Sequence, residues 1–218
     1  MKIKTSIINI EIEYLLFIVI LISIFSIHFR IYMKLYFIYY LFIVFHELSH
    51  VFIAAILGKK VYQLKFSLAG ACAVFNDNFE ENSLKQIIIN IIVYFAGPIS
   101  NFLFAFFFKE NQMIFEINLF LFFVNLLPIF PLDGFKILKN LLYLFKYKKI
   151  IKFNIEKFIK ILQWLLLFFL FSVSILQIIK YYNPTILIFL MYIYIINKEE
   201  KEKINVGKII KNIENKKM

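Results

Sequence analysis

Two histidines and a glutamate stand close together in the run from Phe45 to His50. Residues i and i+4 share one face of a helix, so His46 and His50 can give two imidazole nitrogens to one zinc ion. Glu47, the next residue along, is close enough to act as general base toward a water at that metal. This His-Glu-x-x-His pattern therefore predicts one catalytic Zn²⁺ held by His46 and His50.

The element that must position this pattern is an apolar run from Leu35 to Leu57, which is long enough to cross a bilayer. A carboxylate at the centre of a membrane helix costs at least about 2.5 kcal/mol, so Glu47 needs a partner or a function there. The alternative interpretation is a buried polar cluster without a metal. The membrane setting favours the metal.

The whole chain is unusually apolar. Of its 218 residues 62% are hydrophobic and 20% are aromatic, and the mean hydropathy is +0.80, whereas a soluble domain is about half apolar. We predict an all-α polytopic membrane protein with one membrane domain over residues 1–196. Six transmembrane helices are expected, over residues 14–29, 35–57, 87–108, 117–132, 161–179 and 181–196.

The distribution of positive charge predicts the orientation. With the N-terminus in the cytoplasm and all six spans in place, 21 of the 25 Lys and Arg residues fall on the cytoplasmic side. Both termini are therefore expected in the cytoplasm of what we take to be a bacterial cell. This topology accounts for the net charge of +11, and no nucleic-acid partner is predicted. One cysteine excludes an intramolecular disulfide.

Three segments between or after the spans are not expected to cross the bilayer. In residues 61–75 apolar and polar side chains first alternate, and a run of small apolar residues follows. This pattern predicts a short membrane-associated β-hairpin turning near Gly70. Residues 135–160 mix eight lysines with apolar residues and predict a basic amphipathic segment on the inner membrane surface. Residues 197–218 form a charged cytoplasmic tail.

Catalytic zinc usually has three protein ligands and one open position, so a third ligand is needed. Asp133 is the strongest candidate, because Pro128 and Pro131 break the end of the fourth span and unwind backbone at membrane depth. The alternative is that Asp133 only caps the following helix. His28, near the outer end of the first span, is the weaker candidate.

The motifs together resemble those of the site-2 protease family, the intramembrane zinc metalloproteases of peptidase family M50. Besides the histidine pattern, the matching residues lie in the third and fourth spans, and they are Gly97, Pro98, Asn101, Asn125, Pro128, Pro131, Asp133 and Gly134. The resemblance implies that His46, His50 and Asp133 bind the zinc and that Glu47 is the general base. It also implies that Asn125 faces the substrate or the oxyanion, and that the hairpin offers a strand edge to an extended substrate.

Within this family the chain resembles the compact sporulation branch. That branch releases a membrane-tethered pro-sigma factor in the mother-cell membrane around the forespore, under membrane regulator proteins. Two features depart from the resemblance. Phe135-Lys136 stands where relatives commonly have a second glycine and a basic residue, and the tail has no room for a nucleotide-binding CBS domain.

Two other functions remain open from the sequence. A membrane zinc transporter or metal-sensing protein would use the same ligands without hydrolysis, although it would not need Glu47 at that offset. A catalytically silent membrane partner would bind a single-pass protein through the hairpin and the basic inner segment.

Overall fold

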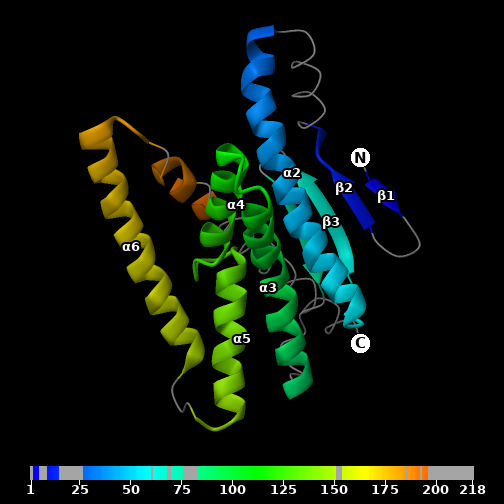
Figure 1. Ribbon diagram of the computed structural model, residues 1–218. Coiled ribbons are helices and arrows are strands. Elements are labelled where there is room, and N and C mark those ends of the chain that lie inside the picture. The colour runs from blue at the N-terminus through cyan, green and yellow to red at the C-terminus, as the bar shows by residue number, and fades with distance from the viewer. Residues whose placement is uncertain are drawn as a thin grey trace, which may run out of the picture.

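A computed structural model of the 218-residue chain describes residues 2–4, 9–14, 27–59, 61–67, 70–75, 83–150, 154–184, 186–191 and 193–195. The described part is mostly helical, with a small sheet on one side (Figure 1). Most of the predicted first span, and the whole predicted tail over 197–218, lie outside the described residues.

The longest helix is α2, Ile27–Ile56, which carries the histidine pattern. The sequence predicts two spans separated near residues 30–34. Helix α2 runs through these residues without interruption, and the apolar span within it begins at Met33, close to the predicted start at residue 35. Arg30 and Lys34 interrupt the apolar run, but the segment contains no proline or glycine that would end a helix. The two charged residues therefore mark the end of an apolar run, but they do not end the helix.

Beside α2 lies a four-stranded sheet in the order β1-β2-β3-β4 (Figure 1). Strands β3, Val61–Ser67, and β4, Gly70–Phe75, pair antiparallel in the segment for which a hairpin is predicted. The N-terminal strands β1, Lys2–Lys4, and β2, Asn9–Ile12, were not predicted. Strand β2 pairs in parallel with β3, a contact between segments about 50 residues apart that local sequence patterns do not reveal. The fold is therefore helical with a sheet of four strands, two more than the predicted hairpin provides.

Helix α3, Leu84–Phe107, packs against α2, α4 and α5 and so occupies the middle of the molecule. Its N-cap is Ser83, whose hydroxyl accepts a hydrogen bond from the backbone N–H of Gln86. The face toward the other helices is buried and contains polar residues as well as apolar ones. Buried asparagines are costly in a helix as apolar as α3, so they indicate that its buried face has a function.

Helix α4, Gln112–Asn125, ends seven residues before the predicted end of the fourth span at residue 132. The prolines explain the correction. Pro128 has no N–H to continue the helix ladder, and the residue before a proline disfavours helical dihedrals. An irregular segment with a cis peptide bond between Phe130 and Pro131 follows, and α5, Asp133–Tyr147, begins directly after it.

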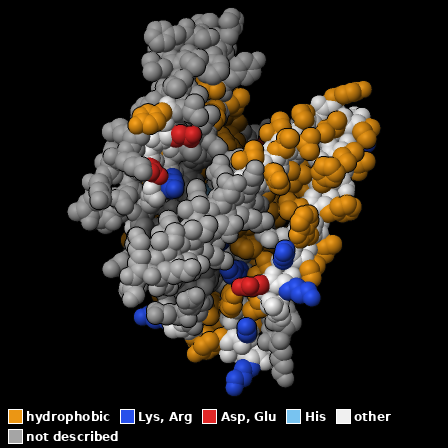
Figure 2. All heavy atoms as spheres, turned by 180° about the vertical axis from the view of Figure 1, so that it is seen from behind, with side chains coloured by type: hydrophobic (Ala, Val, Ile, Leu, Met, Phe, Trp, Pro, Cys, Tyr) orange, Lys and Arg blue, Asp and Glu red, His pale blue; other side chains and the backbone are white. Residues whose placement is uncertain are grey.

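Helix α6, Ile155–Tyr181, and a short helix, Ile186–Ile195, complete the described part. Of the predicted basic segment 135–160, residues 135–147 lie in α5 and residues 155–160 lie in the first turns of α6. Figure 2 shows hydrophobic side chains spread over α6, where Trp164, Phe168 and Ile179 are each about two-thirds or more exposed. Such a surface is stable in lipid and costly in water.

Among the described residues, three helices are long and apolar enough to cross a membrane: Met33–Ile56 within α2, α3, and α6. Helix α4 has 14 residues, or about 21 Å at 1.5 Å per residue, which is shorter than the roughly 30 Å hydrocarbon layer. The fold is therefore that of a helical membrane protein, and the six-span arrangement stays a prediction.

Candidate metal centre

Three donor atoms from two helices converge at the centre of the molecule. Nε2 of His46 lies 3.2 Å from Nε2 of His50, and Oδ2 of Asp133 lies 2.9 Å from each of these nitrogens. All three side chains are buried. His46 and His50 come from neighbouring turns of α2, and Asp133 comes from the first residue of α5.

The triangle fits zinc. Ligands about 2.05 Å from a tetrahedral Zn²⁺ are separated by about 3.3 Å from one another. The three separations here are 2.9, 2.9 and 3.2 Å, so small side-chain shifts bring the donors to that spacing. Two imidazoles and one carboxylate are also a donor set of catalytic zinc sites, which keep a fourth position open.

Each imidazole is oriented by a hydrogen bond from its other nitrogen. His46 Nδ1 donates to Oδ1 of Asn101 at 2.7 Å, and His50 Nδ1 donates to the backbone carbonyl of Val93 at 2.7 Å. Because both acceptors are oxygens without a proton, each Nδ1 carries a hydrogen, which leaves Nε2 as the nitrogen that can bind a metal. This is the tautomer that a metal ligand requires.

A chain of buried amides extends this support. Asn101 donates through Nδ2 to Oδ1 of Asn118 at 3.4 Å, and Asn118 donates to the carbonyl of Ile114 at 2.9 Å. Asn101 and Asn118 have no exposed surface. From the sequence, Asn101 is expected only as a motif residue, and Asn118 is not among the candidate residues. The available signal was an asparagine in the middle of each of two apolar helices.

Gly97 allows α3 to approach the imidazoles closely. A Cβ atom at this position would lie 2.4 Å from Nε2 of His50 and 2.5 Å from Nε2 of His46. Pro98, the next motif residue, is also buried in α3. Glycine is thus required at residue 97 because the donor atoms themselves occupy the space that any side chain would fill.

The break between α4 and α5 determines how Asp133 reaches the histidines. The N-cap of α5 is Leu132, and no side-chain cap bond is formed there, so Asp133 does not act as the cap. At Gly134 a Cβ would lie 2.1 Å from the carbonyl oxygen of Leu126. Gly134 therefore lets the first turn of α5 pack directly on the backbone at the end of α4.

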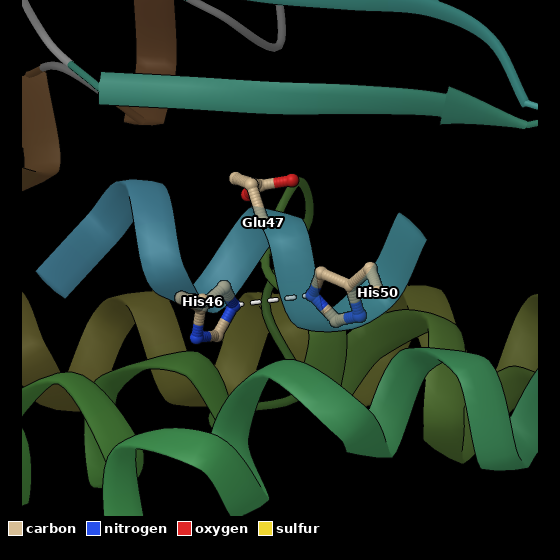
Figure 3. Close-up of side chains that lie close together, drawn as sticks. All are labelled: His46, Glu47 and His50. Carbon is tan, nitrogen blue, oxygen red and sulfur yellow. Dashed lines mark hydrogen bonds between the residues drawn. The ribbon is translucent and has the colours of Figure 1, made fainter. Parts of the chain in front are cut away.

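Glu47 points away from the imidazoles toward the strands, whereas His46 and His50 face α3 (Figure 3). Its Oε2 accepts a hydrogen bond from the backbone N–H of Ala73 in β4 at 2.8 Å. One Glu47 oxygen and the two histidine nitrogens still lie within 4.8 Å of one another. Glu47 is thus beside the site and bound to the sheet.

The remaining predicted residues are placed differently. Asn125, at the end of α4, donates from Nδ2 to the carbonyl of Leu121 one turn earlier at 3.0 Å, and none of its described contacts reaches the three donors. Pro128 and Pro131 are half-buried in the irregular segment. His28 lies in the first turns of α2, 18 residues before His46.

Comparisons with known proteins show which families and structures this chain is similar to. The family model for Peptidase family M50 matches residues 107–170, which include Asn125, Asp133 and Gly134. A zinc metalloprotease of Methanocaldococcus jannaschii is 28% identical over 220 residues, covering 96% of this chain and 62% of that protein. The chain therefore spans less than two thirds of the length of this relative.

The fold is shared with a solved structure, the site-2 protease from Methanocaldococcus jannaschii. The TM-score is 0.56 and the identity 23%, over 89% of this chain and 92% of that chain. The chain is thus similar in sequence to Peptidase family M50 and to a zinc metalloprotease, and similar in fold to a site-2 protease.

Proposed function

We propose that this chain is an intramembrane zinc metalloprotease that hydrolyses a peptide bond of a membrane-tethered protein. The observation that carries the proposal is the convergence of His46 Nε2, His50 Nε2 and Asp133 Oδ2 within 3.2 Å of one another, with Glu47 beside them. The Peptidase M50 family implies zinc as the metal. The three apolar helices support a site inside the membrane.

The proposed chemistry divides between the metal and Glu47. Zinc, when bound, would lower the pKa of a water and polarise the scissile carbonyl. Glu47 accepts the proton as the water oxygen attacks the carbonyl carbon, and then donates that proton to the leaving amine when the C–N bond breaks. His46, His50 and Asp133 stay fixed through both steps because their outward atoms are already bonded to protein groups.

Glu47 must turn from β4 toward the metal before it can act. Its bond to Ala73 N–H is a single charge-assisted hydrogen bond, worth about 1.5–3 kcal/mol, which a side-chain rotation can exchange for a bond to water. Ala73 lies on the edge strand of the sheet, where an unwound substrate backbone would pair by strand addition. Substrate pairing there would free the carboxylate.

Water and substrate are proposed to enter from the cytoplasmic side, which the lysine distribution favours. A cavity of about 530 Å³ between α5, α6 and the short helix supports this route, because it adjoins Ile129 within the proline break and Phe135 just after it. Lys139, Glu156 and Lys160 also line it. Asn125 is proposed to contact the substrate or oxyanion with the amide hydrogen that Leu121 does not use.

The substrate is proposed to be a membrane-tethered pro-sigma factor processed during sporulation. This follows from the resemblance to the compact sporulation branch and rests on no contact in the structure. The same resemblance implies membrane regulator proteins and a position in the mother-cell membrane around the forespore. The family's membrane setting supports only the coarser statement that the substrate is a membrane protein.

The test is co-expression of the full chain with a candidate tethered pro-sigma factor, beside the variants E47Q and E116Q. E47Q keeps the size and removes the basic carboxylate, so we expect bound zinc and no cleavage. E116Q makes the same change at an exposed residue of α4 and should cleave normally. Cleavage by E47Q at the wild-type rate would refute the general-base role.

The rival function is a membrane zinc transporter, favoured by the fact that the ligands alone suffice for metal binding. Purified protein in zinc-loaded vesicles distinguishes the two. A protease gives no zinc flux above that of empty vesicles. Flux that E47Q retains, with no cleavage by wild type, would establish transport instead.

A further inference from the structure

The second oxygen of Asp133 also has a partner. Oδ2 faces the two imidazoles, and Oδ1 lies 3.8 Å from Nζ of Lys136, one turn further along α5. Both side chains are largely shielded, with 10% of the Asp133 side chain and 28% of the Lys136 side chain exposed. One oxygen of the Asp133 carboxylate therefore faces the imidazoles, and the other faces the Lys136 ammonium.

A buried aromatic ring holds the Lys136 ammonium in place. Its Nζ lies 4.9 Å from the ring centroid of Tyr94, which is 1% exposed. An ammonium over a desolvated ring is held more strongly than one over an exposed ring. Tyr94 follows Val93, whose carbonyl orients His50. The ring therefore links Lys136 to the segment of α3 that positions the site.

A polar network adjoins Tyr94 and the backbone of Lys136. Lys59, just after α2, lies 5.1 Å from the same ring and donates to Oδ1 of Asn90 at 2.7 Å. Asn90 donates to Asn140 at 3.3 Å, and Asn140 donates to the carbonyl of Lys136 at 2.8 Å. Both asparagines are buried. The contacts join α3, α5 and the end of α2 beside Tyr94, the ring that the Lys136 ammonium contacts.

We propose that Lys136 is a positioning residue that holds Oδ1 of Asp133 away from the metal. A carboxylate can bind a metal through one oxygen or through both, and binding through both would occupy the position that a catalytic site keeps open. The Lys136 ammonium attracts Oδ1 and leaves Oδ2 alone to face the histidines. This inference rests on the proposed zinc site and assigns a role to a residue outside the ligand set.

The experiment compares K136M, K136R and K146M in the full-length protein in detergent. K136M removes the charge and keeps the length, K136R keeps the charge, and K146M changes an exposed lysine near the far end of the same helix. Zinc affinity is measured by competition with a chromophoric chelator. The coordination number is measured from the visible absorption of the Co²⁺-substituted protein, which weakens when a fifth ligand is added.

For K136M we expect the Co²⁺ absorption to weaken because Oδ1 becomes a further ligand, and zinc affinity to rise by about tenfold because a ligand oxygen is gained and a nearby positive charge is lost. K136R should restore both, and K146M should match wild type. A merely structural role would lower the melting temperature of the metal-free protein without changing the Co²⁺ spectrum. If K136M does not fold, K136Q provides the same charge removal.

Unchanged zinc affinity and an unchanged Co²⁺ spectrum in K136M would overturn the inference. A K136R variant with the same Co²⁺ spectrum and zinc affinity as K136M, in a protein that melts normally, would also overturn it. These readouts do not require proteolysis, so the two proposals fail separately. Wild type without zinc binding would refute the proposed function as well, whereas wild-type binding matched by K136M refutes only the role of Lys136.

Discussion

Replacing Gly97 by alanine should disable the metal site with little change elsewhere. The added Cβ would lie 2.4 and 2.5 Å from the two Nε2 atoms and 2.6 Å from Cε1 of His50. Ordinary contacts of this kind are about 3.5 Å. Each ring must therefore move by about 1 Å, or α3 must move away from α2 by a similar amount.

The magnitude follows from the bonds that such a movement breaks. Each ring is held through Nδ1 by a buried hydrogen bond of 2.7 Å, to Asn101 or to Val93. Losing both costs about 1 kcal/mol each, or roughly 30-fold in zinc affinity. A displacement of 1 Å at a reacting centre can cost about 10²-fold in rate. We expect G97A to bind zinc about 30- to 100-fold more weakly and to show no measurable cleavage.

The matched control is G58A. It is also a glycine-to-alanine change, but it lies just after the end of α2 and away from the imidazoles. Gly58 has a φ of +70°, and a Cβ there meets no atom within 4 Å. G58A therefore strains the backbone by about 1–2 kcal/mol and should bind zinc normally. Chelator competition and thermal unfolding of the metal-free proteins separate the two effects. Wild-type zinc affinity in G97A would refute the close approach of α3 to the imidazoles.

Two further variants test the support around the ligands. N101A removes the acceptor of His46 Nδ1, so we expect a 10- to 100-fold loss of zinc affinity by chelator competition; unchanged affinity would show that His46 needs no such partner. G134A places a Cβ 2.1 Å from the backbone oxygen of Leu126, which cannot rotate aside. We expect a loss of about 1–3 kcal/mol in stability together with weaker zinc binding as Asp133 shifts, and a normal melting temperature would contradict the packing described here.

The sequence was most informative where the physics is local. The spacing of His46 and His50 predicts that both face one way, because the helical repeat requires it. The prolines predict a break near Asp133, although they end α4 earlier than expected because the effect of a proline reaches back along the helix. Asp133 lies 2.9 Å from both histidines, and no local pattern predicts this contact. Only the expected depth of these residues in the membrane and the order of the motifs along the chain indicated it.

The parts that sequence reasoning missed depend on distant contacts. The pairing of β2 with β3 joins residues 9–12 to residues 63–66, and no periodicity reports such a partnership. Asn118 and Lys136 look like isolated polar residues until α3, α4 and α5 are packed together. The continuity of α2 was missed because hydropathy indicates where an apolar run ends and does not indicate where a helix ends.

The bond between Glu47 and Ala73 also has a consequence for the solvation of the sheet. Glu47 precedes Ile56, the end of α2, by nine residues, which is about 13–14 Å along the helix axis at 1.5 Å per residue. With α2 as a membrane span, β4 must reach that far below the membrane surface. Peptide groups at such depth need partners or a water-filled cavity. Strand β2 provides partners for one edge of β3, and the Glu47 carboxylate provides one for Ala73. The sheet is therefore best regarded as part of the membrane domain, with its hydrogen bonds replacing the water that a surface hairpin would have.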